Sequence, residues 1–354
     1  MQKVVSAGMA VFYNPVMSLN RDLSVILLKS IGKRKLVVAD PLAGTGVRSL
    51  RFLKELPGMI EELRANDGNP RFPALFRKQL KLNKIPSKNV VVARREASSF
   101  LLDGPGFDYV DVDPFGSPNP FLDAACKKLS RDGIIAVTAT DTGALAGSFP
   151  DACHRKYWAE PLRNELMHEV GIRILIRKVQ LIASQYDRAL VPIFVHATQH
   201  YDRVYLHCEK SRSYVKALLD KHGYLLYCER CMDRAVSNAN VGMCSCGEPF
   251  KAAGPMWLGP LWNHALVKKM LVTSKGDAEK LLSVIHQESH IPIVGFFDIH
   301  KICSLLKVPV PKTAEVIAAL KRKGHDVGLT HFSPTGIRTD APLEEVKSII
   351  ARLK

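Results

Sequence analysis

Short apolar runs alternate with helix-like patterns over the first 140 residues of the chain. Runs of this kind are typical of buried strands, and the patterns between them are typical of helices that connect parallel strands. A repeated strand–helix–strand order predicts an α/β fold with a parallel sheet. The expected strands are 35–40, 60–67, 89–96, 107–113 and 133–140. The second is the weakest prediction, because its sequence IEELRAND has little apolar character.

The chain changes in character after this region. Residues 189–198 and 202–209 predict an antiparallel pair that closes the sheet. Residues 213–272 combine paired cysteines with the Gly/Pro-rich run AAGPMWLGPLW, which suggests a small separate module. We therefore expect a first domain over 1–212 and a module over 213–272.

The remaining residues, 273–354, have a helical pattern. The best helix is expected at 312–324, and the turn-rich segment 330–342 is expected to form a hairpin. Three helices followed by a hairpin are compatible with a winged helix, so we expect an α+β C-terminal domain here.

Acidic residues stand at the ends of four successive predicted strands, namely Asp40, Asp67, Glu96 and Asp113. The carboxyl ends of parallel strands meet at one edge of a sheet, and ligands of such sheets bind at that edge. Four acids in register therefore predict a binding site for a nucleoside-type cofactor.

The loop DPLAGTG (40–46) follows the first strand and supports this prediction. Gly44 and Gly46 let the backbone approach a ligand closely, and the helix that begins near Val47 presents free N–H groups. The alternative is an ordinary tight turn between strand and helix. No Lys-Ser/Thr pair follows the glycines, so the loop is not a P-loop.

Two of the strand-end acids have specific predicted partners in such a cofactor. Asp67 lies 21 residues after Gly46, where a carboxylate can accept hydrogen bonds from both ribose hydroxyls. Glu96 and the small Ala97 are expected to border an adenine ring.

The fourth strand ends in Asp113-Pro114-Phe115-Gly116, which resembles the Asp-Pro-Pro-aromatic signature of methyltransferases that act on exocyclic amino groups. The lone pair of such an amino group is delocalised into the ring. A carboxylate and a carbonyl that accept its N–H bonds favour the tetrahedral nitrogen that attacks a methyl group. Phe115 can stack on a base that has left its helix. The alternative is a turn that merely ends the strand.

Asp113 alone is expected to be essential for this chemistry. Asp108 and Asp111 are predicted to share its strand face, but at 3.3 Å per residue they lie about 16 Å and about 7 Å away from it. At these distances they cannot contact the same nitrogen.

The charge of the chain changes the expected partner. Its 50 basic and 34 acidic residues give a net charge of +16 without a basic tail. Dispersed Lys and Arg are typical of a surface that contacts many phosphates, which predicts a nucleic acid. The alternative is a basic protein without this role. The sequence shows no run of 18 apolar residues and no signal peptide, so we expect an intracellular, cytoplasmic protein without a membrane segment.

Four of the eight cysteines form two close pairs, Cys228/Cys231 and Cys244/Cys246, with 12 residues between the pairs. Two such pairs provide the four ligands of a tetrahedral zinc ion, and a site with four thiolates leaves no open position for water. We therefore expect a structural zinc. The other cysteines are expected to be inert.

Three further signals carry less weight. HEVGI (168–172) lacks the second His of a metalloprotease helix. The stretch 155–163 mixes cations with aromatic rings beside the active edge, which predicts either RNA contact or rings that pack into the core. Lys321 to Lys323 end a helix, where cations also suit the helix dipole.

Several segments together resemble the tRNA guanine-26 N2-dimethyltransferase family, in a compact form like that of archaea. They are FYNPVMSLNRD (12–22), DPLAGTGVRSLR (40–51), DVDPFGSP (111–118), TATDTGALAG (138–147), CHRKYWAEPLRNELMHEVGIRIL (153–175), MWLGPLW (256–262) and THFSPTGIRTDAP (330–342).

The resemblance implies a class I, Rossmann-like methyltransferase domain followed by a C-terminal domain specific to the family. It also implies S-adenosylmethionine as methyl donor, guanine N2 in tRNA as acceptor, and contacts from Arg21 and Arg48 to the donor. Glu96 departs from the family pattern, which favours Asp at this position.

Two other functions remain open at this stage. One is an amino-methyltransferase that acts on another RNA guanine or on adenine in DNA. The other is a zinc-containing winged-helix protein that binds RNA without catalysis. The strand-end acids and the Asp-Pro-Phe-Gly turn argue against the second, because RNA binding alone requires none of them.

Overall fold

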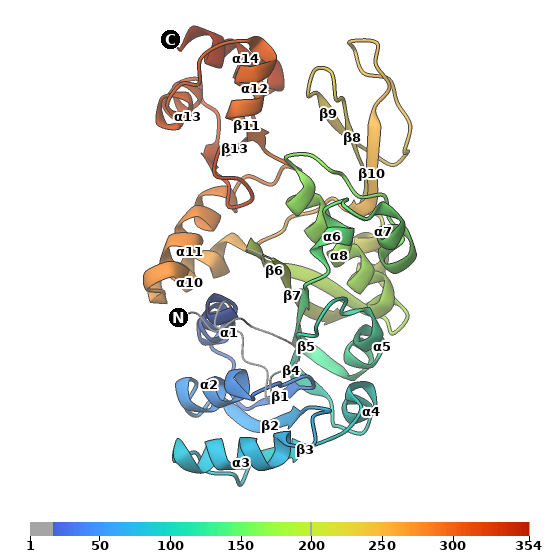
Figure 1. The fold of residues 1–354 in the computed structure, drawn as a ribbon, viewed down its shortest axis with the longest axis vertical. Helices are drawn as coiled ribbons and strands as arrows, with labels where there is room; N and C mark the ends of the chain where they lie inside the picture. The colour runs from blue at the N-terminus through green and yellow to red at the C-terminus, as the bar shows by residue number, and fades with distance from the viewer. Residues whose placement is uncertain (1–16, 199, 354) are drawn as a thin grey trace.

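The structure is a computed structural model that describes residues 17–198 and 200–353. Part of the first segment that carries the family resemblance, residues 12–16, lies outside the described residues. A seven-stranded sheet forms the centre of the larger, lower part of the molecule (Figure 1). Its strand order is β3-β2-β1-β4-β5-β7-β6.

The five strands at the start of the chain pair in parallel, as the alternating pattern predicted. They are β1 (Leu36–Asp40), β2 (Ile60–Asn66), β3 (Val90–Ala93), β4 (Phe107–Val112) and β5 (Leu129–Ala139). The predicted closing pair is also present as β6 (Arg188–Thr198) and β7 (Tyr201–Lys210), where β7 runs antiparallel to both of its neighbours.

Helices cover both faces of this sheet (Figure 1). The helices α1 (Ser18–Ile31), α2 (Val47–Glu55) and α3 (Phe72–Leu82) lie on one face. The other face carries α4 (Ala97–Leu102), α5 (Asn119–Lys128) and the long α8 (Met167–Ser184). The short helices α6 (Thr142–Leu145) and α7 (Pro150–Tyr157) follow β5. The apolar side chains of β1, β4 and β5 are buried between the two helical layers, which explains their near-continuous apolar runs.

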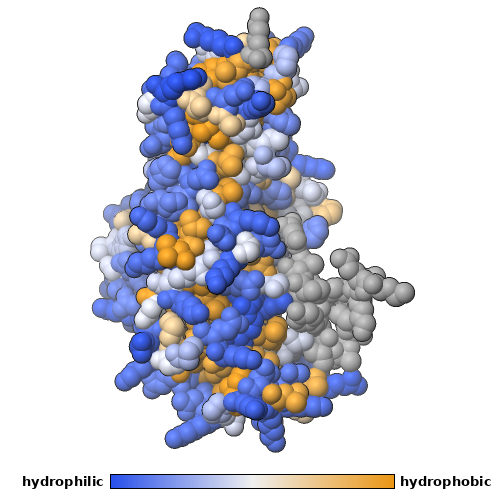
Figure 2. All heavy atoms as spheres, turned by 90° about the vertical axis from the view of Figure 1, so that its left-hand side faces the viewer, coloured by the Kyte–Doolittle hydropathy of each residue, from blue (hydrophilic) through white to orange (hydrophobic). Residues whose placement is uncertain are grey.

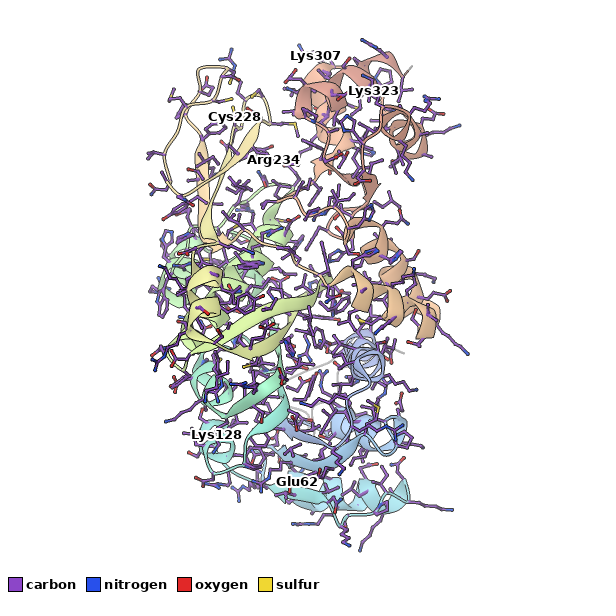
Figure 3. The ribbon with its side chains drawn as sticks, turned by 180° about the vertical axis from the view of Figure 1, so that it is seen from behind. Glu62, Lys128, Cys228, Arg234, Lys307 and Lys323 are labelled. Carbon is purple, nitrogen blue, oxygen red and sulfur yellow. The ribbon has the colours of Figure 1, made fainter. Side chains whose placement is uncertain are left out.

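The paired cysteines lie on a separate three-stranded antiparallel sheet with the order β10-β8-β9. It consists of β8 (His222–Tyr227), β9 (Arg234–Ser237) and β10 (Lys251–Trp257), and α9 (Arg212–Leu219) precedes it. Arg234 on β9 points toward the C-terminal part of the chain (Figure 3). Its guanidinium donates to the carbonyl of Phe296 and lies 4.0 Å from the ring centroid of Phe297.

The C-terminal part contains the predicted helices and hairpin. Its helices are α10 (His264–Thr273), α11 (Gly276–Glu288), α12 (Ile299–Leu306), α13 (Thr313–Arg322) and α14 (Leu343–Arg352). The strands β11 (Phe297–Asp298), β12 (Val327–Leu329) and β13 (Gly336–Thr339) form an antiparallel sheet with the order β11-β13-β12. The order helix, strand, two helices and hairpin from α11 to β13 is that of a winged helix.

A buried charge network connects this part to helix α8. Arg338 of β13 donates to Glu169 of α8 at 2.6 Å and to Glu288 of α11 at 3.1 Å. Glu169 also accepts from Arg173 at 2.9 Å and from the backbone N–H of Gly295 at 2.8 Å. Burial raises the pKa of Glu169, but Arg338 and Arg173 outweigh this effect and lower it to about 2. The glutamate is therefore ionised and paired.

Figure 2 shows a largely hydrophilic surface with scattered apolar side chains on the face that includes α1, α2, α10 and α11. Among the described residues, none of the helices combines the length and the apolar character that crossing a membrane requires.

Candidate active site

The structure brings the ends of β1, β2, β3 and β4 to one edge of the sheet, because these strands are parallel neighbours. Asp40 is the last residue of β1, and Asp67 and Asp113 come directly after β2 and β4. Glu96 is the exception: β3 ends at Ala93, three residues earlier than the sequence pattern predicted. The four acids nevertheless belong to the same edge.

The loop after β1 contains two glycines in the left-handed region, with φ of 57° at Gly44 and 75° at Gly46. A side chain at Gly46 would also collide with the ring of Phe76, since its Cβ would lie 2.2 Å from a ring carbon. Gly46 is the N-cap of α2, so the loop leads directly to the free N–H groups of that helix. The sequence therefore needs glycine here for two independent reasons.

Asp67 is bound to this loop. One of its carboxylate oxygens accepts the backbone N–H of Gly44 at 2.8 Å, and the other accepts that of Asn69 at 2.8 Å. Each oxygen retains acceptor capacity for a ligand hydroxyl. Asp67 therefore positions the glycine loop in addition to the predicted ribose role.

Glu96 has a structural role that the sequence analysis missed. It is the N-cap of α4, and its two carboxylate oxygens accept the backbone N–H groups of Ser98 and Ser99, each at 2.7 Å. The hydrogen bond from Ser98 has the largest effect on Glu96, and together with that from Ser99 it lowers the pKa of this carboxyl. Ala97 is the first residue of the helix and is buried. The cap thus places both residues beside the edge of the sheet.

A buried cluster of charges lies below the end of β4. Asp111 accepts hydrogen bonds from both terminal nitrogens of Arg203 at 3.0 and 2.7 Å, and from the hydroxyl of Tyr109 at 2.8 Å. Its carboxylate also lies 3.5 Å from Nε of Arg48. Burial raises the pKa of Asp111, but the charges of Arg203 and then Arg48 outweigh it and lower the pKa. Asp111 is thus the counter-charge of two buried arginines.

Arg48 connects this cluster to Asp113. Its Nη2 donates to the carboxylate of Asp113, and its Nη1 donates to Asn20 at 2.8 Å and Ser24 at 2.9 Å. Asn20 and Ser24 lie on α1, as does Arg21, which is buried. Three described elements (α1, α2 and the end of β4) therefore meet at this guanidinium, and the Asp113 carboxylate is held beside it.

Asp40 is buried beneath the same edge and accepts the hydroxyl of Ser49 at 2.6 Å. Burial, and then the charge of Asp111, raise the pKa of Asp40 to about 7. Burial therefore disfavours the charged form of Asp40.

The turn after Asp113 is anchored to the end of β5. The N–H of Gly116 donates to Oγ1 of Thr140 at 2.6 Å, and the N–H of Thr140 donates to the carbonyl of Gly116 at 3.0 Å. Gly116 has a φ of 76°. Phe115 is 72% exposed, which is unusual for a phenylalanine at the end of a buried strand. Much of its surface therefore faces solvent beside the end of β4.

A group of polar residues that the sequence pattern did not indicate lies on the other side of this turn. The hydroxyl of Tyr157 donates to Asp141 at 2.6 Å and lies 3.2 Å from Oγ of Ser117. Asp202, at the start of β7, is buried, and burial followed by the charge of Asp141 raises its pKa to about 8. Asp141 lies two residues after β5, so a fifth strand-end acid was the signal that could have identified it.

Asp108 does not share a face with Asp113, which corrects the sequence analysis. The two residues are an odd number of positions apart, so their side chains point to opposite faces of the sheet. Asp108 instead pairs with Lys33 at 2.8 Å and accepts the N–H of Val37 at 3.0 Å. Asp111 does share the face of Asp113.

The four paired cysteines lie together at the end of the β8–β10 sheet, where Figure 3 labels Cys228. Their sulfur atoms are all within 4.8 Å of one another, with 3.5 Å between Cys228 and Cys246 and 3.4 Å between Cys231 and Cys244. Four thiolates at Zn–S distances of about 2.3 Å are about 3.8 Å apart. The arrangement is compatible with a structural zinc.

Comparison with known proteins gives matches along the whole chain. The model of the N2,N2-dimethylguanosine tRNA methyltransferase family matches residues 1–351. A protein of Aquifex aeolicus named tRNA (guanine(26)-N(2)/guanine(27)-N(2))-dimethyltransferase is 39% identical, over 97% of this chain and 90% of its own.

Two further similarities are of the same extent. A tRNA (guanine(26)-N(2))-dimethyltransferase of Methanobrevibacter smithii is 37% identical, over 99% of this chain and 93% of its own. The solved complex of Trm1 from Pyrococcus horikoshii with S-adenosyl-L-methionine has a TM-score of 0.89 and 35% identity, over 98% of this chain and 96% of its own.

Proposed function

The chain belongs to the N2,N2-dimethylguanosine tRNA methyltransferase family, as its segments suggested, and on this premise we propose that it methylates N2 of guanine 26 in tRNA. S-adenosylmethionine is the donor, and two successive transfers give N2-methylguanosine and N2,N2-dimethylguanosine. The observation that carries the proposal is the turn at the end of β4, which combines a carboxylate held by Arg48 with an exposed aromatic ring. The reaction takes place in the cytoplasm.

The donor occupies the edge of the sheet, which matches the predicted class I methyltransferase fold. When bound, it supplies a methyl group activated by the sulfonium. Gly44 and Gly46 permit close approach of the donor to the backbone, and Asp67 accepts hydrogen bonds from the ribose. Glu96 and Ala97 border the adenine. This assignment is supported by the convergence of the strand ends.

The two arginines have different places in this proposal. Arg21 lies on α1 next to Asn20, which itself binds Arg48. The guanidinium of Arg48 is surrounded by four side chains, so its main effect is to orient the carboxylate of Asp113. Arg21, which lies on α1 beside the same edge, is a second candidate for the carboxylate of the methionine moiety. Asp40, buried at the start of the glycine loop, accepts the hydroxyl of Ser49 and so connects the end of β1 to the first turn of α2.

Asp113, Pro114 and Phe115 act on the guanine. The base stacks on Phe115, and its amino group donates one N–H to the carboxylate of Asp113 and the other to the carbonyl of Pro114. The nitrogen lone pair then forms the new N–C bond while the S–C bond of the donor breaks. The proton that leaves the nitrogen passes to Asp113 and from there to solvent. The same steps repeat for the second methyl group.

The remaining parts of the chain bind the tRNA. The net charge of +16 suits many phosphate contacts, and the winged-helix part from residue 273 offers exposed cations on α13. The four-cysteine cluster holds a zinc ion that stabilises the β8–β10 sheet. We assign methyl transfer to residues 1–212, the zinc-binding module to 213–272 and tRNA binding to 273–354.

Mass spectrometry of nucleosides tests the function directly. Purified protein, donor and a tRNA transcript with guanine 26 should give both methylated nucleosides, and a transcript with adenine 26 should give neither. The name of the Aquifex relative includes guanine 27, so product that persists on the adenine-26 transcript would indicate a neighbouring guanine instead. No methylated guanosine on any transcript would refute the proposal.

A further inference from the structure

A pocket lies between the end of α7 and the β8–β10 sheet, apart from the sheet edge where we place the donor. It has a volume of about 380 Å³ and is lined by Trp158, Tyr224, Asn240 and Pro255, among others. Backbone hydrogen bonds of 2.7 and 2.8 Å between Glu160 and Gly254 join its two walls. Pockets of this size at the junction of two structural units are typical sites for a ligand of nucleoside size.

Trp158 is the main feature of this pocket. It ends α7 in the left-handed conformation, with φ of 57° and ψ of 44°, and it is 51% exposed. The other two tryptophans of the chain, Trp257 and Trp262, are buried. Nζ of Lys178 lies 2.9 Å from the ring centroid and covers one face of the Trp158 ring. A rigid, exposed aromatic ring of this kind is a platform for a stacked base.

The surroundings of the ring favour an anionic ligand with a planar group. Arg155 and Lys156 are exposed on the last turn of α7, where Lys156 pairs with Asp141 at 3.1 Å. Arg177 donates to the carbonyl of Trp158 at 3.3 Å. The acid in the lining, Glu160, is paired with His154 at 2.5 Å. The cations can contact phosphates on either side of the base, while Asn240 can hydrogen bond to a base edge.

The pocket is connected to the Asp-Pro-Phe-Gly turn through α7. Tyr157, next to Trp158, contacts both Asp141 and Ser117. Asn119, just beyond the turn, donates to the carbonyl of Lys156 at 2.7 Å. The turn that carries Phe115 and the pocket that contains Trp158 are therefore linked through residues 117–119 and 156–157.

We propose that the Trp158 pocket binds a second unpaired base of the same tRNA, near the methylated guanine, and so helps to keep that guanine out of its helix. The inference rests on the proposed function. Both roles considered for the stretch 155–163 are then present in it: Tyr157 packs into the core, and Trp158 contacts the RNA.

The first test compares Trp158→Ala and Trp158→Phe with Leu82→Ala, a control at a 66% exposed apolar residue on α3, at the bottom of the molecule in Figure 1 and away from α7. Loss of one stacked base should weaken tRNA affinity about ten-fold or more in Trp158→Ala. Trp158→Phe should retain most of the affinity, and the control should equal the wild type. Donor affinity should be unchanged in all three. Equal tRNA affinity of Trp158→Ala and the wild type would overturn the proposal.

Two further measurements do not depend on the stability of the alanine variant. Because the other tryptophans are buried, tRNA should quench the fluorescence of Trp158 in the wild type, and Trp158→Phe should lose this quenching. Abasic tRNAs, each without one base near guanine 26, should identify one position whose loss weakens the wild type but not Trp158→Ala. Absence of quenching, or of any such coupled position, would refute the pocket. A wild type that fails to methylate tRNA would refute the proposed function instead.

Discussion

Asp111 and Asp113 are two residues apart on the same strand face, and we expect replacement by asparagine to lower mainly stability at Asp111 and mainly the methylation rate at Asp113. Asp111 is fully buried, is hydrogen bonded to Arg203 and Tyr109, and also neutralises Arg48. Asp111→Asn leaves two buried guanidinium groups with less negative charge. Breaking a buried pair in this way costs about 3–5 kcal/mol of unfolding free energy.

Asp113 is different because its side chain is 18% exposed, and Arg48 keeps Asp111, Asn20 and Ser24 as partners without it. Asp113→Asn should therefore lower the unfolding free energy by about 1 kcal/mol or less. It should reduce the methylation rate at least about 100-fold, in the range of general-base loss. The affinities for donor and tRNA should change little.

Urea unfolding and single-turnover methylation of the two variants test this contrast. The pKa of Asp111 is lowered in the folded protein, so its stabilising effect is present above the pKa of the unfolded chain and is lost as pH falls below it. The difference between wild type and Asp111→Asn should thus shrink below about pH 4. Near-wild-type methylation by Asp113→Asn would show that this strand end is only a turn. Wild-type stability of Asp111→Asn would refute the electrostatic reasoning.

Three further predictions concern other parts of the molecule. Asp67→Ala should weaken donor binding about ten-fold or more by calorimetry without changing tRNA affinity; unchanged donor affinity would exclude the ribose role. Metal analysis should find one zinc per chain, lost in Cys228→Ser but not in the control Cys303→Ser, and a zinc-free wild type of full stability would contradict this. Because the pKa of Asp202 is raised in the folded protein, wild-type stability should fall as pH rises from about 4 to about 8. The melting temperature of Asp202→Asn should therefore exceed that of the wild type by an amount that grows across this range. A difference independent of pH would argue against a buried, protonated Asp202.

The parallel strands could be predicted from the sequence because strands buried on both faces give continuous apolar runs, as at 35–40 and 107–113. The end of β3 could not, since Glu96 is an uncommon N-cap residue and its capping bonds to Ser98 and Ser99 replace further strand. The meeting of the strand-end acids at one edge could be predicted from the parallel order of the strands alone.

The roles of the buried charges required the structure. Arg203 and Asp111 are 92 residues apart in the chain, and the proximity of Asp202 to Asp141 depends on the antiparallel pairing of β5 and β7. Neither pattern nor spacing carries this information. A sequence motif indicates which residue types a site contains, whereas the pairing of distant elements decides which of them are ionised, buried or exposed.

The buried network around Glu169 determines how the proposed tRNA-binding role of the C-terminal part can be tested. Deletion from residue 273 would remove Arg338 and leave Glu169 with reduced compensation in the interior, so a truncated protein would be destabilised in addition to binding tRNA less well. Exposed cations on α13 avoid this problem. The double variant Lys321→Ala/Arg322→Ala should bind tRNA more weakly, and the slope of log affinity against log salt should fall by about 0.7–0.9 for each phosphate that the variant no longer binds. The rate at saturating tRNA should not change, because the network keeps the catalytic and C-terminal parts in one arrangement. Lys81→Ala, on α3 at the opposite end of the molecule, is the control. A salt slope equal to that of the wild type would show that this helix end does not contact the tRNA.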